Sequence, residues 1–348
     1  MRTHSLICAA MIAAMLFPAT AAAQSDIRPE IGPTEELSKP PVILPAHTLT
    51  FAQKDGQDLK LDIYLPAISG TPKAASSQDA AVDAGIQAPA KPAILFIFGG
   101  GFFSGDRVSG VTPWAKMMTE EGFPVISIDY RLGLKGVNNA GVNLKFIKAL
   151  RKAVDMAVED LFSAVNFLIA EGSKYGIDAK NLVICGSSAG AVTALQAEYE
   201  ICNGTALASV LPEGYNFAGL MPFSGAIFDT KHSHLRFNGP LCPMALFHGT
   251  ADKLVTYKKI ALPGMCFAGT HEIAKRLAKA DRTFQVYRYE GQGHEVSCYI
   301  EHCFEREIEF LTNEVMLGRG RSIDALINDP TAPSPEWGKA DFKKTYAE

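Results

Sequence analysis

Three residues of this sequence have the types and the order that nucleophilic catalysis by serine requires. Ser188 is the central residue of 186–190, G-S-S-A-G, which matches the pattern G-x-S-x-G and follows a run of apolar residues. Asp252 and His294 come later in the chain, each a few residues after another apolar run. A serine hydroxyl attacks efficiently only when a base takes its proton and an acid orients that base. The three residues therefore predict a catalytic Ser188–His294–Asp252 site.

The position of G-x-S-x-G along the chain adds to its specificity. Residues 186–190 could be an ordinary turn between a strand and a helix, Asp252 could be a helix cap, and His294 could be a loop histidine. A nucleophile at a sharp strand-to-helix turn, followed in order by an acid and then a histidine, is the arrangement of one known class of serine hydrolase. This order favours the catalytic interpretation. Three other histidines that follow the serine are interpreted as structural: His248, His271 and His302.

A glycine run is the candidate for binding the oxyanion of the reaction. Gly99, Gly100 and Gly101 follow an apolar run, and three glycines let backbone N–H groups approach one point without a Cβ in the way. We predict the backbone N–H groups of Gly100, Gly101 and Ala189 as donors. A tight turn or a phosphate loop is the alternative, but neither G-x-G-x-x-G nor G-K-[ST] is present, which disfavours nucleotide binding.

Two aromatic residues come directly after the glycines. Phe102 and Phe103 are predicted to lie near the nucleophile, where their bulk would limit the acyl pocket to short chains. The alternative is that both rings pack into the core and do not contact the substrate.

The elements that must position these residues alternate along the chain. Unbroken apolar runs, typical of strands buried on both faces, occupy 93–98, 125–128, 182–185, 220–223, 244–247 and 284–289. Helical patterns lie at about 113–121, 143–172, 189–201, 271–280 and 299–316. The alternation predicts right-handed crossovers and an α/β fold, with a mostly parallel central sheet and helices on both faces. Two antiparallel strands, 48–51 and 59–65, are predicted before it around the turn Asp55-Gly56.

The composition indicates a globular protein. The 348 residues are 47% hydrophobic, and 33 basic residues against 37 acidic ones give a net charge of −4. This balance offers no electrostatic case for binding nucleic acid or an anionic membrane.

The first 23 residues have the organisation of a signal peptide. Arg2 is followed by the apolar run 6–17 and by the small residues 21–23, after which cleavage would leave Gln24 at the N-terminus. The run is too short to cross a bilayer as a mature helix. We therefore expect a periplasmic or secreted protein without a membrane anchor.

Export changes the interpretation of the cysteines. In an oxidising compartment six cysteines allow up to three disulfides and 15 pairings, among which the sequence does not choose. Cys185 lies in an apolar strand and is interpreted as a buried free thiol. Neither a C-x-x-C pair nor a His/Cys cluster has zinc spacing, which disfavours a metal site. The six cysteines are Cys185, Cys202, Cys242, Cys266, Cys298 and Cys303.

Taken together, the motifs resemble those of the α/β-hydrolase superfamily, in the carboxylesterase branch near hormone-sensitive-lipase-like enzymes. Residues 128–132, I-D-Y-R-L, are similar to the D-Y-R-L signature of that branch, and 159–188 resembles its helix and its approach to the nucleophile. Phe98 stands where the family usually has the histidine of H-G-G-G. Residues 98–105 instead resemble the G-G-G-F loop of type-B carboxylesterases and cholinesterases, although this chain is short for that group. Arg131 is expected to pair with a carboxylate such as Asp160.

The resemblance covers about 93–310 and implies a serine carboxylesterase that needs no cofactor or metal. Its expected substrates are short-chain acyl or aryl esters, including feruloyl or acetyl esters of plant polysaccharides. A serine peptidase of the same fold and a non-catalytic binding module are the alternatives, and the oligomeric state is left open. The predicted domain organisation is a signal peptide at 1–23, an extended arm at 24–46, the hydrolase domain at 47–318 with a surface loop at 66–92, and a tail at 319–348.

Overall fold

The computed structural model describes residues 43–67, 91–137, 144–280, 282–329 and 332. The predicted signal peptide, most of the predicted arm and surface loop, and the last part of the predicted tail lie outside the described residues.

The described chain begins with two antiparallel strands, as predicted. They are β1 (His47–Lys54) and β2 (Gln57–Tyr64). Asp55 and Gly56 join them, and both residues have a positive φ, of 51° and 77°. A two-residue turn with this backbone matches the twist of the strands that it connects.

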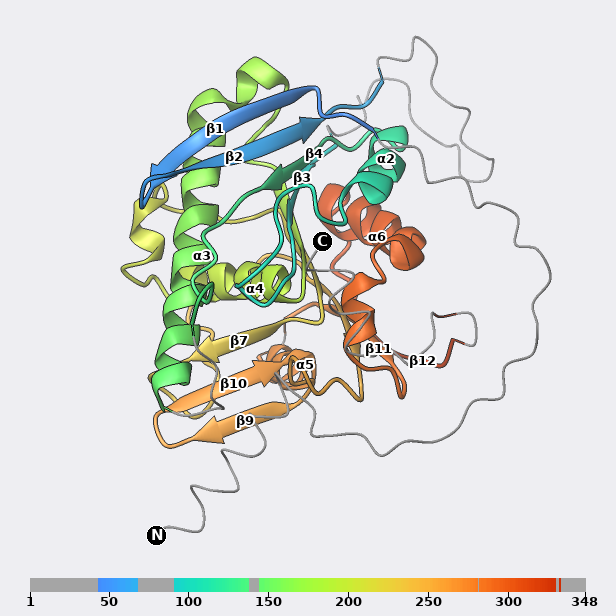
Figure 1. The fold of residues 1–348 in the computed structure, drawn as a ribbon. Coiled ribbons are helices and arrows are strands. Elements are labelled where there is room, and N and C mark those ends of the chain that lie inside the picture. The colour runs from blue at the N-terminus through green and yellow to red at the C-terminus, as the bar shows by residue number, and fades with distance from the viewer. Residues whose placement is uncertain (1–42, 68–90, 138–143, 281, 330–331, 333–348) are drawn as a thin grey trace, which may run out of the picture.

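A nine-stranded sheet forms the centre of the molecule (Figure 1). Its order is β1-β2-β4-β3-β5-β6-β8-β11-β12. β2 is antiparallel to β4, and every pairing from β4 to β12 is parallel. The mostly parallel α/β sheet predicted from the apolar runs is therefore confirmed. The further strands are β3 (Ala93–Ile97), β4 (Val125–Ile128), β5 (Leu182–Ser187), β6 (Gly219–Phe223), β8 (Ala245–Gly249), β11 (Gln285–Tyr289) and β12 (Ile323–Ile327).

Helices cover both faces of this sheet (Figure 1). On one face α3 packs against α4, while on the other the Trp114 indole N–H of α2 donates to Glu307 of α6 at 2.6 Å. These helices follow the predicted ranges closely. Their bounds are α2 (Thr112–Glu120), α3 (Leu144–Glu171), α4 (Ala189–Cys202), α5 (Thr270–Lys279) and α6 (Phe304–Phe310); the short helical turns are Gly172–Tyr175, Ala208–Val210, His294–Cys298, Glu301–Cys303 and Leu311–Met316.

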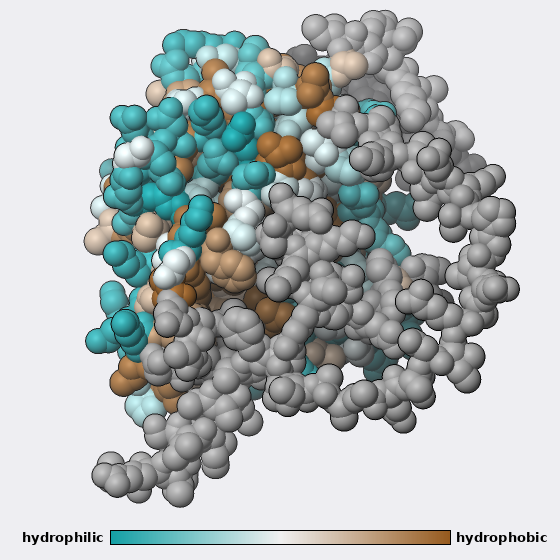
Figure 2. Space-filling view, viewed as in Figure 1, coloured by the Kyte–Doolittle hydropathy of each residue, from teal (hydrophilic) through white to brown (hydrophobic). Residues whose placement is uncertain are grey.

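α3 is the longest of the described helices and shows why these segments are helical. Its buried residues recur at spacings of three and four, which places them on one face of a helix. The exposed surface on that side of the molecule is mostly hydrophilic (Figure 2). The buried residues include Phe146, Ala153, Val154, Ala157, Val158, Leu161, Val165 and Leu168.

A second, three-stranded sheet was not predicted. Its order is β7 (Ala226–Asp229), β10 (Met265–Gly269) and β9 (Lys259–Leu262), and its pairings are antiparallel. Figure 1 shows it beside the start of α3. β9 alternates between exposed and half-buried positions and β10 has two half-buried residues, so neither forms a continuous buried run, whereas β7 is fully buried and was missed.

The predicted tail contains the last strand of the central sheet. β12 pairs in parallel with β11, with Ile323 opposite Gln285, and Asp324 forms an ion pair with Arg288 at 2.6 Å. The predicted domain boundary at residue 318 therefore falls before the sheet is complete. β12 was missed because an edge strand exposes every second side chain and so lacks a continuous apolar run.

All six cysteines that follow the predicted signal peptide lie among the described residues, and none of them forms a disulfide there. The predicted disulfide is therefore not supported. Cys185 is the buried thiol that its strand context indicated, and burial raises its pKa well above the usual value. In the described part of the chain, no helix combines the length and the apolar character needed to cross a membrane.

Candidate active site

Ser188 lies at a strained turn between β5 and α4. β5 ends at Ser187 and α4 begins at Ala189, and Ser188 itself has φ 50° and ψ −113°. A positive φ is costly for a residue with a side chain and is characteristic of functional turns. The turn also requires glycine on both sides: a Cβ on Gly186 would lie 2.5 Å from the Gly190 carbonyl carbon, and a Cβ on Gly190 would lie 2.0 Å from the Ile97 oxygen.

The structure brings the three residues of the predicted triad together. Ser188 Oγ lies 2.8 Å from His294 Nε2, and His294 Nδ1 lies 2.8 Å from Asp252 Oδ2. All three are buried, with exposed fractions of 5%, 4% and 8% for Ser188, His294 and Asp252. They follow β5, β11 and β8, whose carboxyl ends meet at one edge of the parallel sheet. His294 begins a short helical turn, His294–Cys298, rather than lying in an open loop.

The partners of His294 determine its tautomer. The Asp252 carboxylate only accepts hydrogen bonds, so Nδ1 of His294 carries the proton. Nε2 then has a lone pair directed at the Ser188 hydroxyl. This is the protonation state in which histidine can act as a base toward serine.

Asp252 is ionised in spite of its burial. Burial alone would raise its pKa, but the electrostatic attraction of the His294 ring and the hydrogen bonds from His248 and His294 outweigh that effect and hold the pKa well below its usual range. The backbone N–H groups of Leu254 and Val255 donate to the other oxygen, Oδ1, at 2.8 and 3.0 Å.

The predicted oxyanion residues lie beside this turn. Gly100, Gly101 and Phe102 have consecutive positive φ values of 112°, 63° and 66°. The N–H groups of Phe103 and Ser104 donate to the Gly100 carbonyl at 3.1 and 3.2 Å, which closes the glycine loop on itself. The Ile97 and Phe98 carbonyls lie against Gly190 in the first turn of α4, so the loop and the Ala189 N–H come from adjacent segments.

Tyr130 contacts the loop at Phe98, the residue that replaces the histidine of the H-G-G-G motif that the loop resembles. Its ring stacks on the Phe98 ring with a centroid separation of 4.3 Å. Its hydroxyl donates to the Phe98 carbonyl at 3.1 Å, with the Gly99 carbonyl at 3.4 Å. The residue after it forms the predicted ion pair, because the Arg131 guanidinium Nη2 lies 2.9 Å from Asp160 Oδ1.

The two aromatic residues predicted to contact the substrate lie in different environments. Phe102 is 3% exposed and packs in the core with its ring 6.1 Å from the Tyr130 ring, which is the alternative that its sequence position left open. Phe103 is 37% exposed, and a Cβ on Gly101 would lie 2.5 Å from its ring. Only Phe103 remains a candidate for limiting the acyl pocket.

His248 was interpreted as structural, yet it contacts the site directly. It is fully buried at the end of β8, and its Nε2 lies 3.2 Å from Asp252 Oδ2. The signal available in the sequence was the spacing of four residues between His248 and Asp252.

Ser224 has φ 55° and a buried hydroxyl without a partner among the described residues. His302, which was interpreted as structural, has its Nε2 2.8 Å from Asp329 Oδ2.

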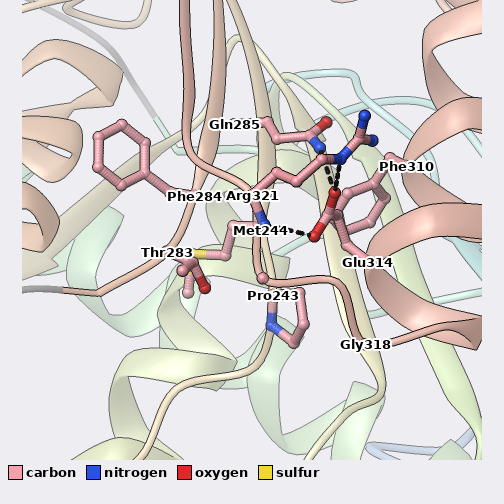
Figure 3. A pocket seen from close by; sticks show the side chains of 10 residues that line it. Pro243, Met244, Thr283, Phe284, Gln285, Phe310, Glu314, Gly318 and Arg321 are labelled. Atoms are coloured by element: carbon pink, nitrogen blue, oxygen red, sulfur yellow. Dashed lines mark hydrogen bonds and ion pairs between the residues drawn. The ribbon is translucent and has the colours of Figure 1, made fainter.

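A cavity of about 190 Å³ lies at the other edge of the sheet (Figure 3). Pro243 and Met244, which precede β8, and Thr283 to Gln285, at the start of β11, line it. The Gln285 amide and the Arg321 guanidinium point to Glu314 and donate to its Oε1 at 3.1 and 2.6 Å (Figure 3). The candidate triad follows the opposite, carboxyl ends of the same strands, so this cavity is separate from it.

A metal centre is not found among the described residues. Among them, no group of three or more His, Cys, Asp and Glu side chains could hold a metal ion.

Comparisons with known proteins identify the fold. Residues 79–205 match the BD-FAE family model, which describes esterases of the α/β-hydrolase fold. The apo form of esterase 2 from Thermogutta terrifontis is similar with a TM-score of 0.53 at 22% identity, over 83% of this chain and 100% of that one. The chain has the α/β-hydrolase fold.

The same esterase phosphorylated by paraoxon matches this chain with a TM-score of 0.50 at 22% identity, over 79% of this chain and 98% of that one. Among curated protein sequences, none matches the chain. The resemblance to α/β-hydrolase carboxylesterases that the motifs predict is confirmed, because residues 79–205 match a family model of esterases with this fold.

Proposed function

We propose that this α/β-hydrolase is an exported serine carboxylesterase that hydrolyses short-chain acyl or aryl esters. The observation that carries the proposal is the continuous hydrogen-bonded path from Ser188 Oγ through His294 to Asp252, with 2.8 Å at each step. A strained serine at the end of a buried strand and an adjacent glycine loop support the same assignment.

In the acylation step, Ser188 Oγ forms a bond to the ester carbonyl carbon while its proton passes to His294 Nε2. The carbonyl oxygen becomes an oxyanion, which accepts hydrogen bonds from the backbone N–H groups of the glycine loop and Ala189. Asp252 stabilises the imidazolium through Nδ1–H. Collapse of the intermediate breaks the bond to the alcohol, which leaves with the proton from Nε2.

Deacylation repeats these steps with water as the nucleophile. His294 takes a proton from water, the hydroxide forms a bond to the acyl carbon, and Ser188 leaves as the alcohol after it recovers the proton from His294. The products are a carboxylic acid and free enzyme.

The substrate proposal rests on the predicted export and on Phe103. A protein exported by the signal at 1–23 meets esters outside the cytoplasm, and the classes proposed here are acetyl and feruloyl esters of plant polysaccharides. The half-exposed Phe103 ring over Gly101 supports a short acyl pocket. Each methylene of an acyl chain that becomes buried contributes about 0.8 kcal/mol to binding. A pocket that is closed at its end cannot bury further methylenes, so longer acyl chains gain no binding free energy there.

The test is a kinetic screen of the mature chain from Gln24 on p-nitrophenyl acetate, butyrate, octanoate and palmitate, with methyl ferulate and acetylated xylan alongside. We expect kcat/KM to be highest at acetate or butyrate and to fall beyond roughly eight acyl carbons. Phe103→Ala should move the maximum toward longer chains. A maximum at palmitate would contradict the short pocket, and an inactive chain that still folds would favour a binding module.

A further inference from the structure

The Asp252 carboxylate has two histidine partners at the same oxygen. His294 Nδ1 lies 2.8 Å from Asp252 Oδ2, and His248 Nε2 lies 3.2 Å from that atom. His248 and the Asp252 side chain are both fully buried. The acyl-transfer steps above use only His294, so the second histidine needs a separate explanation.

The neighbours of His248 determine where its proton lies. Nε2 is in contact with Asp252 Oδ2 and with the Val255 carbonyl at 3.1 Å, and neither oxygen has a proton to donate. Nε2 must therefore carry the proton and share it between the two. Nδ1 is left with a lone pair, 2.9 Å from Thr270 Oγ1, whose hydroxyl donates to it.

Thr270 is held in place by the backbone around it. It is the first residue of α5, and the Gly269 N–H before it donates to the Lys258 carbonyl at 2.8 Å. A Cβ on Gly269 would lie 1.7 Å from the Thr256 carbonyl oxygen, so this close approach requires glycine. The start of α5 is thereby fixed against the segment that follows Asp252.

The two oxygens of Asp252 are anchored by different groups. The N–H groups of Leu254 and Val255 both bind Oδ1, so they fix one end of the carboxylate and do not contact Oδ2. The His248 N–H at Oδ2 fixes the second end, and with it the direction in which Oδ2 accepts from His294.

We propose that His248 is a positioning residue: it orients Asp252 toward His294, and Thr270 keeps it in the tautomer that donates to Asp252. This inference rests on the proposed function of the triad. Misplacement of a catalytic group by about 1 Å can cost on the order of 100-fold in rate. The effect belongs to kcat, because His248 is buried behind Asp252 and contacts no surface that a substrate reaches.

The experiment compares His248→Leu with His248→Gln on p-nitrophenyl acetate. Leucine fills similar space without a donor, whereas the Gln amide can donate from about the position of Nε2. We expect His248→Leu to lower kcat roughly 10- to 100-fold with KM within about threefold of wild type, and His248→Gln to recover most of the loss. A purely structural role would lower both variants together, so equal kcat losses in the two, or wild-type kcat in His248→Leu, overturn the proposal.

A second pair of variants, at Thr270, tests the proposal if His248→Leu does not fold. Thr270→Val preserves the shape of Thr270 but lacks the hydroxyl, and Thr270→Ser preserves the hydroxyl. We expect kcat to fall several-fold in Thr270→Val and to stay near the wild-type value in Thr270→Ser. Thermal transitions of both variants show whether they fold. Equal kcat in the two variants overturns the proposal. Wild-type protein that hydrolyses no ester refutes the proposed function instead, since the comparison of variants begins from wild-type activity.

Discussion

At the scale of single residues, Asp252 accepts four hydrogen bonds. Two come to Oδ1 from Leu254 and Val255, and two to Oδ2 from His294 and His248. These bonds keep the pKa of the buried carboxyl group well below its usual range, so the ionised carboxylate can orient an imidazole throughout the neutral pH range.

Asp252→Asn tests this role of the carboxylate. If the Asn amide N–H₂ faces His294, it favours the wrong imidazole tautomer, and the base toward Ser188 is lost. We expect kcat to fall on the order of 10⁴-fold while the fold is retained. Steady-state kinetics on p-nitrophenyl acetate beside Ser188→Ala, with thermal melts of both, measures the loss. Wild-type turnover in Asp252→Asn would mean that another carboxylate orients His294.

At the scale of elements, the glycine loop depends on the segment that follows β4. Tyr130 stacks on Phe98 and donates to its carbonyl, so the position of Gly100 and Gly101 is set partly by a residue outside the loop. The loop lacks the histidine usual in related enzymes, and the Tyr130 contacts explain how it is held without one.

Tyr130→Phe removes the hydroxyl but keeps the stacked ring. We expect kcat to fall roughly tenfold because the loop donors lose alignment, and stability to fall by about 1 kcal/mol for the lost hydrogen bond. Tyr215→Phe is the matched control, since it removes a hydroxyl bond to the Ala179 carbonyl, 3.0 Å long, near the start of β5. If the two variants lose stability equally and neither loses activity, Tyr130 has no part in aligning the loop.

The order of the central elements could be predicted because their signals are local. Strands buried on both faces form continuous apolar runs, and Ser188, Asp252 and His294 each follow one of them closely. β9 and β12 expose alternate side chains, so their strand character depends on partners distant in sequence. The contact of His248 with Thr270 was missed for the same reason, because it crosses from β8 to α5, whereas its contact with Asp252 is local in the sequence.

At the scale of the whole molecule, stability should depend on pH through buried carboxyl groups remote from the catalytic edge. Burial raises the pKa of Glu198 to about 7, even though it accepts hydrogen bonds from the Cys242 N–H and from Asn216. In the unfolded chain this group ionises near its usual value of 4.5. Between these two values the unfolded chain releases a proton that the folded chain keeps, so the contribution of Glu198 to stability is full below about 4.5 and is lost as pH rises to about 7.

Glu198→Gln should remove this dependence. The free energy of unfolding of the variant minus that of wild type should rise by up to about 3 kcal/mol between pH 4.5 and pH 8. A constant difference introduced by the amide does not affect this change with pH. Urea unfolding at several pH values measures the difference, with the exposed Glu213→Gln as control. A difference between Glu198→Gln and wild type that stays constant with pH would show that Glu198 ionises normally in the folded chain.

The identity of the nucleophile is the central claim, and covalent labelling tests it most directly. The folded chain, treated with a fluorophosphonate, should gain one adduct, and peptide mass spectrometry should place it on Ser188. Ser188→Ala should gain none, and the loss of ester hydrolysis should follow the extent of labelling. An adduct on another residue, or full hydrolysis by Ser188→Ala, would contradict the account.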